Sequence, residues 1–154
     1  MKKLFIGLLI VFSSIISHAQ SMDELAIRKV LDNQVIAWNA GNVDEFMKTY
    51  WQNNSLIFIG KSGITYGWQS TLENYKKHYP DTAAMGHLTF VLLEFNHLSP
   101  VYYFVLVKWH LQRSIGNIEG YFTLLFKILD YRKIVLSHPR TRQRKRPGAR
   151  VTNN

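Results

Sequence analysis

Apolar and polar residues alternate along residues 101–113, VYYFVLVKWHLQR, which predicts one long strand of a β-sheet. Because side chains of a strand alternate between its two faces, one face carries Tyr103, Val105, Val107, Trp109, Leu111 and Arg113. We predict two more long strands beside it, over residues 86–96 and 118–126. An apolar face that leads to an indole and then a guanidinium suggests the wall of a pocket.

The first half of the chain has mostly helical periodicity. Over residues 23–39, apolar residues with helical spacing predict a helix that ends near Gly41, the spaced residues being Leu25, Val30, Leu31, Val35 and Trp38. A short helix over residues 43–50 has an apolar face made by Val43, Phe46, Met47 and Tyr50. Residues 55–60 and 64–67 predict a small hairpin, and residues 68–79 predict a third helix before Pro80. We expect residues 81–85 to form a loop.

Helices followed by meandering strands predict an α+β fold, with three N-terminal helices packed on one face of a curved antiparallel sheet. The length suits one such domain, which we place at residues 23–136. A bent sheet wrapped around helices leaves a cavity at its open end, and such a cavity is a common ligand site.

The N-terminus is typical of a secretory signal peptide over residues 1–19. Lys2 and Lys3 precede an apolar run over residues 4–16, and Ser17-His18-Ala19 forms a small-x-small cleavage site. We predict cleavage after Ala19 and a periplasmic or secreted protein without membrane association afterwards. The apolar run is too short to span a bilayer comfortably. The chain has no Cys, so neither a disulfide nor a lipoprotein anchor is expected.

The net charge of +9 belongs mainly to the two ends of the chain. Removing eight cationic residues leaves +1 for the body, these eight being Lys2, Lys3, Arg140, Arg142, Arg144, Lys145, Arg146 and Arg150. A nucleic-acid-binding face needs basic residues gathered on a helix or sheet. We therefore expect no nucleic-acid binding by the folded domain.

Several short motifs resemble the SnoaL-like branch of the nuclear-transport-factor-2-like (NTF2-like) superfamily. They include Ala37-Trp38-Asn39-x-Gly41-Asn42, Tyr50-Trp51, Ser55-Leu56-Ile57-Phe58, Thr65-Tyr66-Gly67-Trp68, Lys108-Trp109-His110 and Gly120-Tyr121-Phe122-Thr123. Within that branch the chain is similar to the exported bacterial group known as domain of unknown function 4440. The resemblance implies an NTF2-like cone. It does not imply one activity, because the superfamily holds isomerases, cyclases, dehydratases and binding modules.

The C-terminus departs from this family. The expected last strand, Lys-x-x-Gly-Lys-Trp-x-Ile-x-x-Asp-His, is replaced by residues 127–138, which lack its Gly, Trp and Asp-His ending. Residues 137–154 have no apolar period and predict a disordered basic tail. One hypothesis is a frameshift near Leu129, and the alternative is a genuine basic tail that binds an anionic surface.

The candidate ligand-binding residues are aromatic, with one guanidinium: Trp38, Tyr50, Trp51, Phe58, Trp68, Tyr75, Trp109 and Arg113. Such a set suits a small hydrophobic or aromatic ligand. Arg113 could hold a carboxylate or polarise a carbonyl, or it could reach solvent from the end of its strand. The aromatic residues have the alternative of being core, which is the more common role of aromatic residues at these spacings.

The sequence leaves catalysis open. An acid–base enzyme needs a carboxylate or His in the pocket. Glu94 and Glu119 lie in predicted strands and are candidates, but an exposed residue at a strand edge is the more common role of such a Glu. His110 faces away from the Trp109 side. The His spacing matches no zinc site, so neither a metal nor another cofactor is expected. The leading hypothesis is a binding module, and the alternative is a SnoaL-like isomerase, cyclase or dehydratase. A homodimer through the outer sheet face is a further expectation, because Phe104 and Leu106 lie there.

Overall fold

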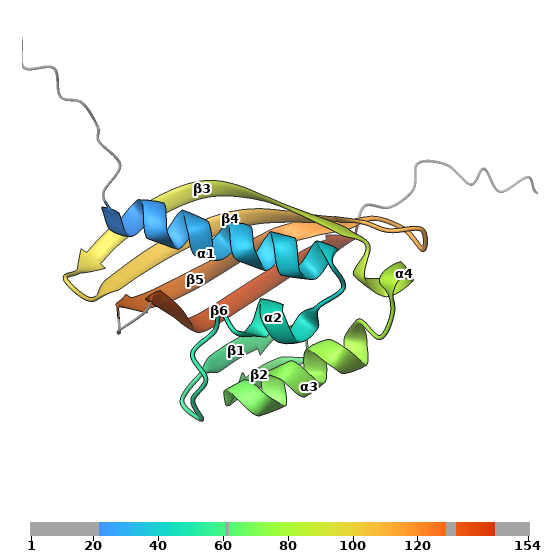
Figure 1. Ribbon diagram of the computed structural model, residues 1–154, viewed down its shortest axis with the longest axis horizontal. Coiled ribbons are helices and arrows are strands. Elements are labelled where there is room, and N and C mark those ends of the chain that lie inside the picture. The colour runs from blue at the N-terminus through green and yellow to red at the C-terminus, as the bar shows by residue number, and fades with distance from the viewer. Residues whose placement is uncertain (1–21, 61, 129–131, 144–154) are drawn as a thin grey trace, which may run out of the picture.

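A computed structural model describes residues 22–60, 62–128 and 132–143. The described elements follow the chain in this order: α1 (Met22–Asn39), α2 (Val43–Met47), β1 (Ile57–Gly60), β2 (Gly63–Tyr66), α3 (Trp68–His78), α4 (Thr82–Met85), β3 (His87–Ser99), β4 (Tyr102–Gln112), β5 (Ile118–Ile128) and β6 (Arg132–Gln143). A long curved sheet lies behind α1, and α2, α3 and the β1–β2 hairpin gather below it (Figure 1). The α+β class is as predicted.

The sheet has six strands in the order β2-β1-β6-β5-β4-β3. The prediction of an antiparallel sheet is wrong at one place, because β1 pairs with β6 in parallel through Ile57↔Leu136 and Phe58↔Ser137. The other pairings between the described strands are antiparallel. The sheet is mixed because β1 pairs with β6, which comes from the far end of the described chain. The other neighbouring strands of the sheet are consecutive in the sequence.

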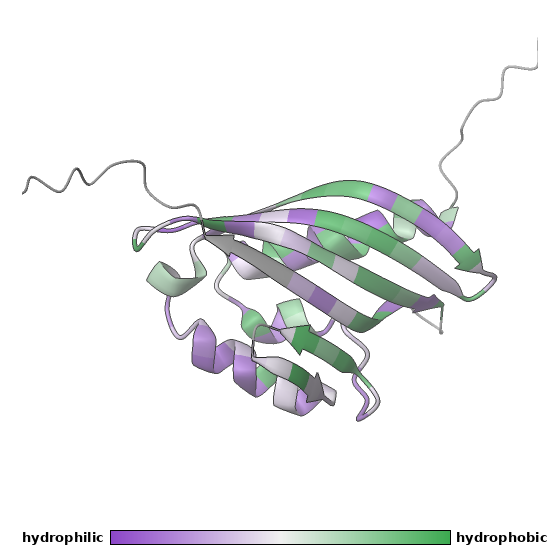
Figure 2. Cartoon of the chain, turned by 180° about the vertical axis from the view of Figure 1, so that it is seen from behind, coloured by the Kyte–Doolittle hydropathy of each residue, from purple (hydrophilic) through white to green (hydrophobic). Residues whose placement is uncertain are grey.

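The alternation along β4 is confirmed. Its inward residues Tyr103, Val105, Val107, Trp109 and Leu111 are buried, and the residues between them are half-buried on the outer face. Seen from behind, the strands carry hydrophobic and hydrophilic bands in alternation (Figure 2). The β4 strand therefore contributes one face to the core, as its period of two requires.

The helices differ from the prediction in two respects. The buried face of α1 is made by Ile27, Leu31, Gln34, Ala37 and Trp38, whereas Leu25 is exposed. The prediction is therefore wrong at Leu25. A helix of this length carries several overlapping apolar stripes, and only the stripe that packs against the sheet is buried. Residues 82–85, predicted as a loop, form a fourth short helix that Asp81 caps by accepting a hydrogen bond from the Ala84 N–H at 2.8 Å.

The C-terminal strand is the main correction. The predicted disordered tail from residue 137 is wrong over residues 137–143, because β6 pairs with β5 from Ile128↔Arg132 to Ile118↔Gln143. Pro139 is tolerated because it lies after the last residue of β6 that pairs with β1, so β6 has a neighbour only on its β5 side there. The frameshift position near Leu129 and residues 144–154 lie outside the described residues, as does the predicted signal peptide.

No helix in the described part of the chain is long and apolar enough to cross a membrane.

Candidate functional site

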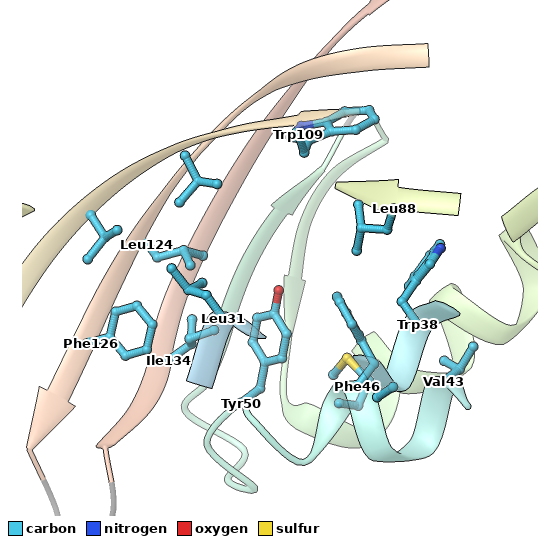
Figure 3. Close-up of a cluster of buried hydrophobic side chains, with 14 of the residues drawn as sticks. Leu31, Trp38, Val43, Phe46, Tyr50, Leu88, Trp109, Leu124, Phe126 and Ile134 are labelled. Atoms are coloured by element: carbon cyan, nitrogen blue, oxygen red, sulfur yellow. The ribbon is translucent and has the colours of Figure 1, made fainter. Parts of the chain in front are cut away.

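A cavity of about 330 Å³ opens between the inner face of the sheet, the helices α1 to α3 and the β1–β2 hairpin. Its walls are mainly aromatic and aliphatic, with Trp38, Phe46, Phe58, Leu88, Phe90, Leu111 and Phe122 among them. Figure 3 shows the inner part of this region, where the Tyr50 hydroxyl points toward the space below Trp109. The volume lies at the lower end of the range for small-molecule sites.

Five of the eight predicted site residues line this cavity: Trp38, Tyr50, Phe58, Tyr75 and Trp109. All five come from different elements or loops, and tertiary packing brings them together. Tyr75 bridges several rings, since its ring centroid lies 5.3 Å from Phe46 and 5.5 Å from Phe58. The prediction therefore included five of the nine Phe, Trp and Tyr residues in the described lining.

The other three predicted residues do not line it. Trp51 lies beside Lys127, whose Nζ is 5.8 Å from the Trp51 ring centroid. Trp68 donates from Nε1 to the Met47 carbonyl at 2.8 Å. Arg113 follows β4, and its Nε donates to the Gly116 carbonyl at 2.8 Å. The turn after β4 therefore holds this guanidinium, which does not continue the β4 face into the cavity.

The sequence analysis missed three buried polar residues that line the cavity, Gln34, Thr71 and Ser137. Gln34 is only 1% exposed and donates from Nε2 to Thr49 Oγ1 at 2.8 Å. Its helical spacing with Leu31 and Trp38 was a usable signal. Ser137 had no such signal, because its burial depends on pairing with Leu124 of β5 and Phe58 of β1.

β6 also places Tyr50 in the wall. The Trp51 N–H donates to the Ile134 carbonyl at 2.9 Å, and the Ile134 N–H donates to the Thr49 carbonyl at 3.3 Å. These two bonds form a parallel bridge between Tyr50 and Ile134. The polar inner end of the cavity is thus built on β6.

The tyrosines of the cavity stay neutral over the physiological range. Burial raises the pKa of Tyr50, and hydrogen bonds with Ser137, Tyr75 and Gln34 only partly oppose it. Burial raises the pKa of Tyr75 well above its usual value, and the neighbouring Tyr50 and Tyr79 raise it further. The pKa of Tyr79 is also raised by burial, with Arg113 opposing the effect. These phenols act as neutral hydrogen-bonding groups.

Trp109 differs from the other buried indole of the cavity. Trp38 donates from Nε1 to the Met85 carbonyl at 3.1 Å. Trp109 is 7% exposed, and its Nε1 has no hydrogen-bond partner, which is true of no other buried side-chain nitrogen or oxygen in the described residues. Its strand neighbours are Phe90 and Gly120, whose side chains offer no acceptor. The indole of Trp109 is therefore a buried donor without a partner in the described structure.

The described part of the cavity lining contains no Asp or Glu. The two strand carboxylates lie elsewhere, because Glu94 is exposed and Glu119 Oε2 lies 3.6 Å from Lys108 Nζ. His78 lines the cavity at an exposed rim position, where Nδ1 is 2.7 Å from the Asn74 carbonyl oxygen. No group of three potential metal ligands occurs among the described side chains. The lining can enclose an apolar molecule and offer hydrogen bonds to it.

Comparison with solved structures finds other proteins with a similar architecture. An NTF-2 like protein of unknown function from Shewanella oneidensis MR-1 is 38% identical, with a TM-score of 0.73 over 77% of this chain and 98% of that one. A ketosteroid isomerase-like protein from Erwinia carotovora atroseptica SCRI1043 is 11% identical, with a TM-score of 0.65 over 79% and 97% of the two chains. An NTF2-like superfamily protein from Salmonella enterica serovar Typhimurium LT2 is 15% identical, with a TM-score of 0.58 over 82% and 94%.

The two distant likenesses show the fold alone. No protein-family model and no curated protein matches the sequence. The Shewanella protein is similar in sequence as well as in fold, since more than a third of the aligned residues are identical across nearly its whole length. Together with the mixed six-stranded sheet curved around its helices, this similarity shows that the chain belongs to the NTF2-like superfamily.

Proposed function

We propose that this protein is a non-catalytic binding domain for a small hydrophobic or aromatic molecule, held in the cavity between the sheet and α1 to α3. The observation that carries the proposal is the chemistry of the lining, which combines an aromatic wall with neutral polar groups. Burial of apolar ligand surface supplies about 25 cal/mol per Å², and shape complementarity with flat rings adds to it.

The alternative, a SnoaL-like isomerase, cyclase or dehydratase, needs a base near the substrate carbonyl. Within the described lining His78 is the one group of that kind, and it is exposed. A base that works by burial-tuned pKa is normally enclosed with its substrate. This difference favours the binding domain over the enzyme.

A titration of the full-length, ¹⁵N-labelled protein with 2-isopropenylnaphthalene tests the proposal. We expect saturable shifts of cavity resonances in the amide and indole NMR spectrum. Phe90→Trp enlarges a ring that lines the cavity and should weaken binding about tenfold, since added volume in a filled site costs about 1–3 kcal/mol. Phe104→Trp, on the outer face of β4, is the matched control and should bind like the wild type. Shifts that do not saturate, or that map to the outer face, refute the proposal.

Within the superfamily, we propose that the chain belongs to the SnoaL-like group and to the exported domain of unknown function 4440 type. The motifs Ala37-Trp38-Asn39-x-Gly41-Asn42 and Lys108-Trp109-His110 support that assignment. Export to the periplasm or the medium follows from the signal-peptide pattern over residues 1–19.

We propose a homodimer through the outer sheet face. Tyr121 and Val91 are 46% and 55% exposed there, on either side of Lys108, and the half-buried Leu106 and Phe104 follow on the same face of β4. An apolar sheet face of this kind is a common association surface. Analytical ultracentrifugation should give a dimer that Tyr121→Asp dissociates, and Ile64→Asp on β2 is the control. A wild-type monomer at about 100 µM, roughly the concentration at which weak dimers form, discards this proposal.

A further inference from the structure

The outward side of α1 carries a regular stripe of residues that lies opposite its buried face. Along the helix the members of this stripe alternate between spacings of three and four residues, and each is exposed: Met22, Leu25, Lys29, Asp32, Ile36 and Asn39. Residues spaced in this way share one face of a helix, as the a and d positions of a coiled coil do. We name these six residues the α1 seam. Its apolar side chains are 78% exposed at Met22, 45% at Leu25 and 66% at Ile36.

The folded domain leaves the middle of this seam unpaired. Lys29 and Asp32 are three residues apart, yet neither takes part in an ion pair or a side-chain hydrogen bond among the described residues. Glu24 and Arg28 of the same helix, by contrast, pair with each other at 2.6 Å. In Figure 1 the helix lies in front of the sheet, and no other described element covers its outward side. The α1 seam therefore has exposed apolar side chains toward both ends and two unpaired opposite charges between them.

A second copy of the same helix complements this stripe. When two copies of α1 lie antiparallel about a two-fold axis between residues 30 and 31, Lys29 of each copy lies level with Asp32 of the other. In the same register Leu25 of each copy lies level with Ile36 of the other. Apolar side chains thus meet on both sides of the axis, and two pairs of opposite charge form beside it. An axis at Lys29 itself would instead place the two lysines together.

The parts of the chain outside the described residues fit the seam less well. Neither residues 1–21 nor residues 131–154 contain Asp or Glu, so neither segment offers a side-chain carboxylate to Lys29. Both segments carry Lys or Arg, which that lysine repels. The charge pattern of the seam is complementary to itself, and this favours a second copy of the protein as the partner.

We propose that α1 is a self-association helix, in which the α1 seams of two copies pack antiparallel with Lys29 and Asp32 paired across the axis. This contact lies on the helix side of the sheet, whereas the dimer proposed above uses the outer sheet face, so the two do not compete. A helix of 18 residues is only about 27 Å long, and one such pair is smaller than a standard interface. Association through the seam alone is therefore weak, and covalent trapping suits its measurement.

The absence of Cys from the chain makes this trapping specific. Leu25→Cys and Ile36→Cys, each in the full-length protein and one of them ¹⁵N-labelled, are oxidised with copper–phenanthroline alone and as an equimolar mixture. Mass spectrometry then identifies the mixed dimer. Two copies of Leu25→Cys alone have their thiols about 16 Å apart along the axis, beyond the roughly 7 Å between Cα atoms that a disulfide allows. We expect at least about tenfold more dimer in the mixture than in either variant alone, because only positions 25 and 36 lie within disulfide reach.

Two controls separate a specific contact from collision. Ile64→Cys, at an exposed position of β2, should give only background product with Leu25→Cys. Tyr121→Asp, on the outer sheet face, should leave the yield of mixed dimer unchanged, so failure of the sheet dimer and failure of the seam are distinguishable.

Charge reversal tests the centre of the register in the same assay. Lys29→Asp or Asp32→Lys in both Cys variants should lower the yield of mixed dimer, because like charges then meet across the axis. The double variant Lys29→Asp/Asp32→Lys should restore it, since opposite charges meet again. Lys77→Asp, an exposed residue of α3, makes the same change in net charge as Lys29→Asp and should have no effect.

The outcomes decide the proposal. A mixture that gives no more dimer than the single variants shows that the copies collide without this register, and the proposal is wrong. Absence of any dimer is equally contrary to it, and the seam then serves residues 1–21 or a different protein. A double charge variant that stays as low as the single ones shows that Lys29 and Asp32 do not face each other. Circular dichroism of each variant confirms that a low yield does not come from unfolding.

Discussion

Asn39 joins α1 to the edge of the sheet through two hydrogen bonds with the backbone of a single residue. The Leu88 N–H donates to Asn39 Oδ1 at 2.7 Å, and Asn39 Nδ2 donates to the Leu88 carbonyl at 3.1 Å. Because β3 is an edge strand, this side of Leu88 has no neighbouring strand to satisfy it. Leu88 in turn lines the cavity.

We predict that Asn39→Ala destabilises the domain by about 1–2 kcal/mol. Two bonds contribute about 0.5–1.5 kcal/mol each, and we take the lower half of their sum because Asn39 is exposed and water can replace part of what is lost. Helix propensity offsets little of this loss, because Asn39 is the last residue of α1 and propensity differences apply to the interior of a helix. For a domain of this size, the melting temperature should fall by roughly 3–8 °C.

Urea unfolding followed by circular dichroism measures this change, and amide hydrogen exchange at Leu88 measures its local effect. Asn33→Ala is the control, because Asn33 is an exposed residue of the same helix and its replacement changes helix propensity. We expect Asn33→Ala to be neutral or slightly stabilising. Equal stability of the two variants, or unchanged exchange at Leu88, would show that the Asn39 bonds contribute nothing net.

Three further predictions concern pH, the C-terminal strand and the N-terminus. Burial raises the pKa of Tyr50 and Tyr75, so these phenols lose their protons at lower pH in the unfolded chain than in the folded protein. The free energy of unfolding should therefore fall as the pH rises above about 10. Tyr75→Phe should reduce this pH dependence when unfolding is measured from about pH 8 to 11. Ending the chain after Leu136 removes the part of β6 that pairs with residues 118–124, and circular dichroism should show an unfolded or aggregated protein, whereas ending it after Gln143 should retain the fold. Mass spectrometry of the protein exported from a bacterial host should give a chain that begins after Ala19, and an uncleaved mass would contradict the signal-peptide prediction.

The long central strand of the sheet could be predicted from local sequence. Alternation from Tyr103 to Leu111 depends only on one face being buried, and a one-residue slip would turn every apolar residue outward. The aromatic residues of the cavity wall were also visible in the sequence, because Trp38, Tyr50 and Tyr75 lie on apolar helix faces or next to them. Local periodicity therefore determined the α+β class and part of the cavity wall.

Tertiary structure decided the rest. Residues 137–143 have no strand-like pattern of their own, and they form a strand because β5 offers a complete row of backbone partners. Ser137 enters the cavity for the same reason, and Arg113 leaves it because its turn offers the Gly116 carbonyl. That Trp38 is satisfied and Trp109 is free depends on which backbone carbonyl lies within reach of each indole, and this is a property of packing between distant segments that no local period records.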